Sequence, residues 1–449
     1  MKKFLTKIKE LFNKASETIH YGFEWLLNNH GHILMILFIS VMAIILRIFF
    51  IEFQSGDTYW FLVPWTRYIR DNGGLFSLNS TPISYFRTPG KNIPYGNPLD
   101  GLTVTSTVYA NYPSFYYFII ALFSYLPISD IAVIKLISGI FDFIMALGVL
   151  FTIKHLSKNN RLLMVLGYTL ALFLPTVFIN SALWGQSDAV FAGMGVWFIY
   201  FLMKDKKCLA MIFIGLGLSI KLHMFFILPI VGILFLRRRF NLLYLLIPPV
   251  VIFLTFIPSY IFGASLKMPF DLLLGVSGTY SAPNMNSGSL YAFFQNLNNT
   301  AKWVNAVQLF GVPFAFFILI IFTYVFYERE IEINNESLLA LGTLFSFLSP
   351  FLLPHMHERY FFMGDIFIVL YVLHNPRRFW LIFISQAASI IAYANFILGG
   401  WLFKSLEASG NLVIAASLNI VIISTLTFDI LKIRKKETIE TEEIIEISQ

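Results

Sequence analysis

The feature of this sequence that most constrains its fold is a series of apolar runs of a length suited to a lipid bilayer. A hydrocarbon core of about 30 Å needs about 20 helical residues to cross it. The runs lie at 33–53, 131–153, 161–181, 188–203, 209–222, 224–236, 242–263, 304–327, 337–353, 359–374, 377–399 and 410–431. Only 13% of the residues are charged, against about 25% in soluble domains. The pattern predicts an all-α polytopic integral membrane protein with about 11–13 transmembrane helices.

Two runs in this series predict departures from simple crossing helices. Residues 113–126 are apolar but too short to cross, so we expect a helix that dips into the membrane. The neighbouring runs 209–222 and 224–236 are also short and nearly continuous, which is typical of a broken or re-entrant helical hairpin.

The sequence predicts a membrane domain at 33–431 with a terminal segment on each side. Two long polar segments interrupt the apolar runs of this domain. The polar segments are 54–112, with an expected interfacial helix at 59–70, and 264–303. Residues 1–32 place apolar side chains at helical spacing between lysines, which predicts an amphipathic segment on a membrane surface. The acidic residues 432–449 predict a solvated tail.

The distribution of basic residues predicts which side of the membrane each loop faces. If the N-terminus is cytoplasmic, 21 of the 32 Lys and Arg residues fall in short cytoplasmic segments, as the positive-inside rule requires. Both termini are then cytoplasmic, and the two long loops lie outside. The net charge of +7 needs no nucleic-acid partner, because its basic residues are topological signals.

Asp57 follows the first apolar run at the membrane boundary and is a candidate general base. The alternative is an ordinary N-cap for a helix that begins at Thr58. Spacing alone favours the cap.

The segment NSALWGQSDAVFA, residues 180–192, places an indole, an amide and a carboxylate within five residues. Trp184, Gln186 and Asp188 could hold a sugar ring through its apolar face and its hydroxyls. An interfacial Trp followed by a helix-capping Asp explains the pattern equally well.

Charged residues inside apolar runs need a partner, because a bare charge in the membrane is costly. Lys221, followed closely by His223, lies between two short runs, and a lipid phosphate is one candidate partner. Lys135 and Asp142 share one expected helix two turns apart, which predicts that they support each other or that Asp142 faces a polar cavity.

The segment LPHMHERYFF, residues 353–362, gathers His355, His357, Glu358 and Arg359 at one predicted outer helix end. The two histidines do not have the i, i+4 spacing of a helical metal pair, so we expect no metal here. Arg359 suits a phosphate, since its planar donors match phosphate oxygens. A purely structural polar cluster is the alternative.

Together these motifs resemble a known family. Gly56-Asp57 after the first span, then Tyr112-Pro113 before an apolar helix, resemble the GT-C fold of membrane glycosyltransferases. The segments WGQSD (184–188), GLSIKLHMFFILP (217–229) and HMHERYF (355–361) are similar to bacterial and archaeal relatives of GPI mannosyltransferase II.

This resemblance implies a glycosyltransferase that moves a hexose, mannose-like or other, from a polyprenyl-phosphate donor to an envelope glycan, lipid or protein. The reaction would occur on the non-cytoplasmic face of the cell membrane, with inversion and without a cofactor or metal. Asp57 would be the base, and the implied phosphate-binding residues are Lys221, His223, His355, His357 and Arg359. The implied sugar- or acceptor-binding residues are Tyr112, Trp184, Gln186, Asp188 and Glu358.

Two other functions remain open at this point. A transporter or flippase of a lipid-linked sugar would be expected to show inverted repeats and polar groups near the bilayer midplane. A non-catalytic scaffold of an envelope complex is the second alternative.

Overall fold

The computed structural model describes residues 20, 29–79, 84–87, 106–109, 112–270, 282–297, 300–397 and 408–433. Its first half contains the helix Asn29–Phe49, η1 (Thr58–Leu62), α2 (Val63–Asp71), η2 (Gly74–Asn79), β1 (Ser84–Arg87), β2 (Ser106–Tyr109), α3 (Ser114–Ser124), α4 (Asp130–Leu156), α5 (Arg161–Phe173), α6 (Pro175–Phe178), η3 (Ile179–Trp184), α7 (Asp188–Met203) and α8 (Lys207–Leu218). The second half contains η4 (Leu222–Ile227), α9 (Leu228–Leu236), α10 (Leu242–Leu245), α11 (Ile247–Thr255), α12 (Ile257–Ile261), β3 (Asn284–Met285), η5 (Leu290–Leu297), α14 (Ala301–Glu328), α15 (Asn335–Leu352), β4 (Met356–His357), α16 (Phe362–His374), η6 (Pro376–Arg378), α17 (Trp380–Ile397) and α18 (Ala408–Leu431).

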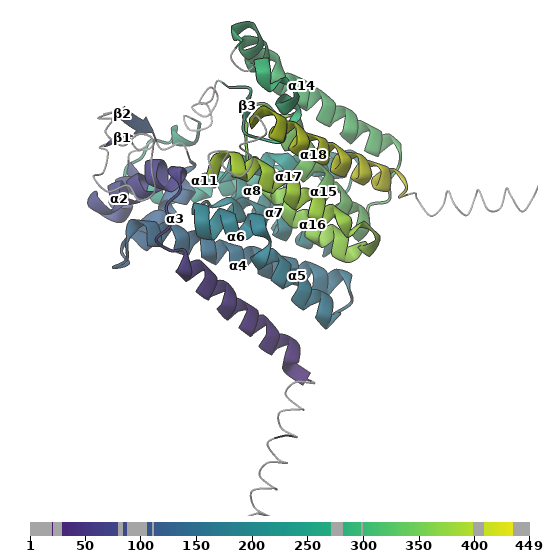
Figure 1. Ribbon diagram of the computed structural model, residues 1–449, viewed down its shortest axis with the longest axis horizontal. Helices are drawn as coiled ribbons and strands as arrows, with labels where there is room; N and C mark the ends of the chain where they lie inside the picture. Colours follow the sequence, from purple (N-terminus) through teal and green to yellow (C-terminus); the bar gives the residue numbers. More distant parts are fainter. Residues whose placement is uncertain are drawn as a thin grey trace, which may run out of the picture.

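The helices form a bundle around α7, which packs against α4, α8, α15 and α16 (Figure 1). Helix α7 is apolar on all sides and buried along most of its length, as expected of a helix at the centre of a large bundle. By contrast, the helix Asn29–Phe49 and α14 carry many exposed Leu, Ile and Phe side chains at the periphery. Apolar side chains exposed over whole helices suit a lipid environment.

Each of the twelve predicted apolar runs coincides with helix in the described chain, which confirms the all-α polytopic fold class. Five of these helices are long and apolar enough to cross a membrane, namely Asn29–Phe49, Asp130–Leu156, Leu242–Ile261, Ala301–Glu328 and Gly410–Leu431. The pair Arg161–Phe173 and Pro175–Trp184, bent by 44°, adds a sixth if it is one span. The remaining apolar helices are shorter.

Two of the shorter helices, α8 and α3, correspond to the predicted departures from simple crossing helices. Helix α8 ends at Leu218, and the chain is extended at Lys221 before η4 begins, so the predicted break between the two short runs is present. Helix α3 has 11 residues and a length of about 16 Å, half of what a crossing helix needs.

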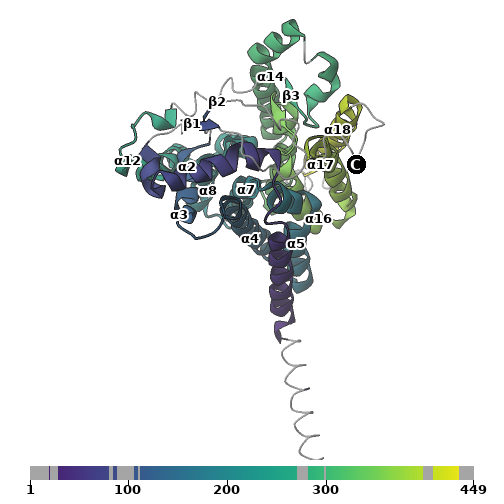
Figure 2. The same ribbon diagram turned by 60° about the vertical axis from the view of Figure 1, so that its left-hand side comes forward.

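Several elements gather at one end of the bundle, among them α2, α3 and the β1–β2 hairpin (Figures 1 and 2). The helix predicted at 59–70 is present as η1 and α2. Strand β1 pairs antiparallel with β2, with Ser84 opposite Tyr109. The short β3 pairs in parallel with β4, so the second long loop is attached to the connection between α15 and α16.

The prediction that Lys135 and Asp142 support each other is wrong. Asp142 accepts hydrogen bonds from the Arg47 side chain of the first helix, 2.7 Å from Nη2 to Oδ2. Lys135 instead donates to the carbonyl oxygens of Phe50 and Phe53, where the first helix has ended. Asp142 therefore attaches the first helix to α4, and Lys135 attaches the segment that directly follows this helix.

Parts of the predicted domain organisation lie outside the described residues. These parts are most of the amphipathic segment 1–32, the tail beyond residue 433, and the stretches 80–83, 88–105, 110–111, 271–281 and 298–299 of the two long loops.

Candidate functional site

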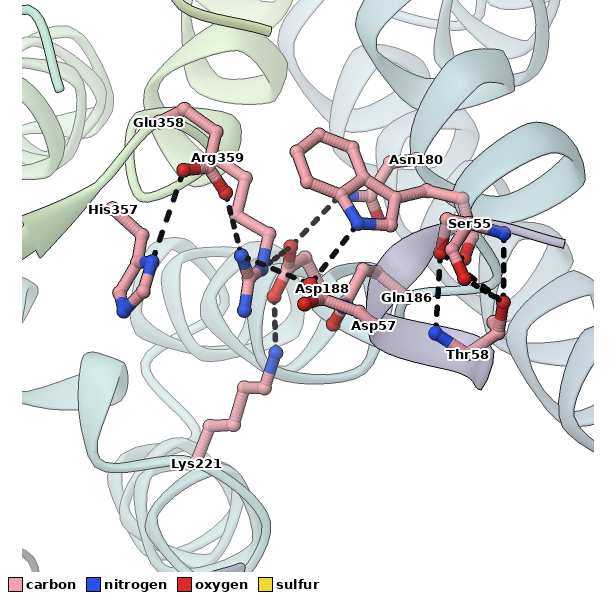
Figure 3. Close-up of polar contacts among 11 residues, drawn as sticks. Ser55, Asp57, Thr58, Asn180, Gln186, Asp188, Lys221, His357, Glu358 and Arg359 are labelled. Carbon is pink, nitrogen blue, oxygen red and sulfur yellow. Dashed lines mark hydrogen bonds and ion pairs between the residues drawn. The ribbon is translucent and has the colours of Figure 1, made fainter. Parts of the chain in front are cut away.

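Asp57 accepts contacts from three donors, all on the same carboxylate oxygen (Figure 3). Trp184 Nε1 lies 3.0 Å from Oδ2 and Gln186 Nε2 lies 2.6 Å from it. Arg359 Nη1 approaches the same oxygen at 3.4 Å. Asp57 occupies the N-cap position of η1, but its side chain makes no capping hydrogen bond. The capping alternative therefore does not explain this side chain.

The turn between η3 and α7 places Trp184 and Gln186 beside Asp57. Gly185 has a φ of +74°, and a Cβ at this position would lie 2.6 Å from Cγ2 of Thr58. Glycine is therefore required both for the left-handed conformation and for the close approach to η1. The Ser55 hydroxyl donates to the Trp184 carbonyl at 2.8 Å and ties the two segments together.

Asp188 is fully buried in the first turn of α7 and binds protein side chains through both oxygens. Oδ1 accepts a hydrogen bond from Lys221 Nζ, and Oδ2 accepts one from Asn180 Nδ2 at 2.8 Å. Arg359 Nε lies 3.6 Å from Oδ2. Ser187, not Asp188, is the N-cap. Asp188 therefore pairs with two cations, Lys221 and Arg359, close to Asp57. It is not the helix cap that the alternative interpretation expected.

Lys221 is held in the break between α8 and η4 with its ammonium group buried. Its Nζ lies 5.1 Å from the ring centroid of Tyr112 and 5.9 Å from that of Phe191, in addition to its contact with Asp188. The pairing with Asp188 and the aromatic faces compensate for the desolvation of this charge.

Arg359 connects three carboxylates that come from different parts of the chain. Its Nη1 donates to Glu358 Oε1 at 2.6 Å and also faces Asp57, while Nε faces Asp188. Its guanidinium carbon lies 5.5 Å from the Trp184 ring centroid, so the indole covers one side of the cation. Among the described residues these ion pairs use Nη1 and Nε, and Nη2 takes part in none of them.

Glu358 is buried between Arg359 and His357. His357 Nδ1 lies 3.7 Å from Glu358 Oε2. Burial acts to raise the pKa of Glu358, but the contact with His357 and the charge of Arg359 outweigh it and hold the pKa below its usual value. Glu358 is therefore a charged residue that orients its two neighbours.

The other two histidines of the predicted motifs, His223 and His355, make different contacts. The His223 ring centroid lies 3.8 Å from that of Tyr360, and its Nδ1 has no hydrogen-bond partner among the described residues. His355 adopts a φ of +61° and contacts the second long loop, with Nδ1 2.8 Å from the Ala282 carbonyl oxygen. Because that oxygen is an acceptor, Nδ1 carries the proton. His355 thus attaches the loop that pairs β3 with β4.

Most predicted site residues therefore lie in one cluster, and two members were not predicted. Tyr112 lies at its edge, with its ring on Lys221 and its backbone N–H donating to the Tyr117 hydroxyl at 2.8 Å. Asn180 begins the segment that contains Trp184, but its contact with Asp188 had no sequence signal. Tyr393 on α17 packs edge-on against Trp184 with ring centroids 5.2 Å apart.

No group of three or more His, Cys, Asp or Glu side chains within the described ranges is arranged to hold a metal ion.

The model of glycosyltransferase family 87 matches residues 109–352, which include Tyr112, the WGQSD segment and Lys221 but not Asp57 or Arg359. Among solved structures, the chain is similar to ArnT from Cupriavidus metallidurans, crystallised with undecaprenyl phosphate bound. The two share 12% identity over 88% of this chain and 76% of that chain, with a TM-score of 0.50. At this identity the likeness shows the fold, and the expected GT-C architecture is confirmed. No curated protein sequence matches the chain.

Proposed function

Because the chain belongs to glycosyltransferase family 87, we propose that it transfers a hexose from a polyprenyl-phosphate donor to an acceptor hydroxyl, with Asp57 as the general base. The family and the fold make it a membrane glycosyltransferase. The bound undecaprenyl phosphate of the similar structure supports a polyprenyl-phosphate donor. The acceptor is an envelope glycan, lipid or protein.

The arrangement of donors on Asp57 is the observation that carries this proposal. All of its contacts among the described residues go to Oδ2, and the side chain is 17% exposed. Oδ1 can therefore accept a hydrogen bond from an approaching hydroxyl, while the three donors fix the plane of the carboxylate. A base held in position by its neighbours loses little entropy when the substrate arrives.

The reaction needs one proton transfer and one displacement. The acceptor oxygen gives its proton to Asp57 and forms a bond with the anomeric carbon of the donor. The bond between that carbon and the phosphate oxygen breaks, and its electron pair leaves with the lipid phosphate. A single displacement inverts the anomeric configuration. No metal or cofactor is required in this scheme, because the leaving phosphate meets cationic side chains.

Arg359 is the best-placed residue for the lipid phosphate, through Nη2, and His357 and His223 flank the same region. Electrostatic stabilisation of a leaving phosphate by such fixed donors is a strong catalytic effect. Lys221 and Asp188 act indirectly, because they are buried against each other and not directed at a substrate. We assign them the positioning of Arg359 and not direct contact with the phosphate or sugar.

The distribution of Lys and Arg supports a site on the non-cytoplasmic face, with both termini cytoplasmic. The cluster lies at the bundle end that carries α2, α3 and the hairpin, the part of the chain between the first two long spans.

The proposal is tested with the full-length protein in lipid nanodiscs and an undecaprenyl-phosphate-hexose donor. Asp57→Asn is expected to insert and fold normally but to lose hexose transfer. Asp71→Asn, an exposed carboxylate at the end of α2, is the matched control and should keep full activity. Mass spectrometry of envelope glycans with and without the protein would identify the acceptor. Full transfer by Asp57→Asn would refute the base assignment, and donor transport without transfer would refute the enzyme.

A further inference from the structure

A cavity of about 200 Å³ lies at the end of the bundle opposite the Asp57 cluster. It is lined by Leu202 and Met203 in the last turn of α7, whose first residue is Asp188. It is also lined by Asn335, the first residue of α15, whose other end leads to the Arg359 segment. Sixteen residues of α7 span about 24 Å, so the cavity is a separate site.

The lining of this cavity combines apolar side chains with charged ones. Leu234, Phe240 and Leu338 provide buried apolar side chains. Lys207 and Arg239 provide two cations, and Asp205 provides one carboxylate. Because the cations outnumber the carboxylate, a ligand that fits this lining combines an anionic group with an apolar portion.

The two cations are available to an anion. Arg239 is an exposed residue, and a guanidinium can bind a phosphate through two parallel hydrogen bonds. Lys207 lies 3.3 Å from Asp205, but the Asp205 side chain is 84% exposed, so this ion pair is weak. In addition, Lys206 at the N-cap of α8 provides no side-chain cap, so the first N–H groups of α8 favour a negative charge nearby.

The size and the surroundings of the cavity indicate a lipid headgroup. Pockets that enclose whole small molecules have volumes of about 300–1,000 Å³, so this cavity holds only part of a larger ligand. Exposed apolar side chains adjoin it in the sequence, namely Phe235, Leu236, Leu242 and Leu243. These side chains can receive acyl chains while the phosphate stays among the cations.

We propose that this cavity binds the headgroup of an anionic phospholipid. Basic pockets between transmembrane helices commonly bind such headgroups. Since α7 and α15 both run from the cavity to the Asp57 cluster, an occupied cavity would brace the two helices that carry or precede the site residues. The proposal does not depend on the reaction assigned to the Asp57 cluster.

The only cysteine of the chain, Cys208, provides a direct test because it is exposed and adjacent to Lys207. The full-length protein in detergent is labelled at Cys208 with an environment-sensitive fluorophore and titrated with short-chain phosphatidylglycerol or phosphatidylcholine. We expect saturable binding of phosphatidylglycerol, about tenfold tighter than that of phosphatidylcholine. Native mass spectrometry of the unlabelled protein checks that the label does not create or block the site.

Charge-matched double variants locate the binding site. Lys207→Gln with Arg239→Gln is expected to reduce phosphatidylglycerol affinity to the level of phosphatidylcholine. Lys158→Gln with Arg161→Gln removes the same charge from exposed positions at the connection of α4 to α5 that do not line the cavity, and should leave the affinity unchanged. Equal loss in both double variants, equal binding of the two lipids, or displacement of the lipid by the same concentration of inorganic phosphate would overturn the proposal.

Discussion

The indole of Trp184 donates its hydrogen bond to Asp57, with 3.0 Å between Nε1 and Oδ2. The same indole covers the guanidinium of Arg359 and packs against Tyr393. One side chain thus orients the proposed base, shields the cation proposed to bind the phosphate, and connects both to α17. The base and the phosphate site are therefore fixed relative to each other by an aromatic residue that reacts with neither substrate.

Trp184→Phe is expected to lower kcat for hexose transfer by about 10- to 100-fold, because a hydrogen bond to a charged group contributes about 1.5–3 kcal/mol. The phenyl ring keeps the packing, so KM for the donor should change little. Trp197→Phe is the matched control, since Trp197 donates only to the Ile144 carbonyl at 3.1 Å, away from the cluster. Equal losses in the two variants would show that the indole acts on stability and not on Asp57.

Asp188→Asn is expected to destabilise the protein by about 3–5 kcal/mol, because it leaves the buried Lys221 ammonium without its counter-charge. Asp188→Asn combined with Lys221→Met should recover part of this loss, since neither charge then remains buried. Asp205→Asn breaks an exposed pair with Lys207 and should cost less than about 1 kcal/mol. Unfolding in detergent gives the free energy of unfolding of wild type and of these three variants. A double variant no more stable than Asp188→Asn would show that Lys221 is not paired as the structure indicates.

The sequence was sufficient to predict the fold class, and most of the residues that it singled out lie together in one cluster. Membrane helices are recognised by the length of their apolar runs, and each run is nearly independent of the others. Asp57, Asp188 and Arg359 all lie at helix ends that charge counting assigns to one face, so their convergence follows from topology.

Contacts between side chains of distant helices could not be predicted in the same way. Lys135 and Asp142 are close in sequence, yet Asp142 bonds to Arg47 of the first helix and Lys135 bonds to carbonyl oxygens just after that helix, because helix packing and not spacing decides their partners. Asn180 and Tyr393 carry no charge, and nothing in the sequence assigned them a role, so only the packed bundle reveals that they contact Asp188 and Trp184.

Gly185→Ala is expected to destabilise the protein through two separable effects, a strained positive φ and a collision with Thr58 Cγ2. Gly263→Ala isolates the first effect, since Gly263 has a φ of +96° and a Cβ at this position would meet no atom within 4 Å. Adding Thr58→Ser to Gly185→Ala removes the colliding methyl group and keeps the hydroxyl that bonds to Ser55. The double variant should recover thermal stability toward that of Gly263→Ala. If the double variant were no more stable than Gly185→Ala, the collision with the Thr58 methyl group would not be the cause of the lost stability.

The lowered pKa of Glu358 predicts how one part of the stability depends on pH. Burial alone would raise this pKa, but the contact with His357 and the charge of Arg359 lower it below the ordinary value of 4.5. Because the folded protein binds this proton less readily than the unfolded chain, the stabilisation is complete above pH 4.5 and is lost as the pH falls through the lower folded value. Wild type should therefore lose stability relative to Glu358→Gln in this acidic range, as measured by denaturant unfolding in detergent. Glu336 is an exposed residue in the first turn of α15. The stability of Glu336→Gln should therefore depend on pH in the same way as that of wild type. If the wild-type and Glu358→Gln curves also ran parallel through the acidic range, Glu358 would not be held charged by its two neighbours.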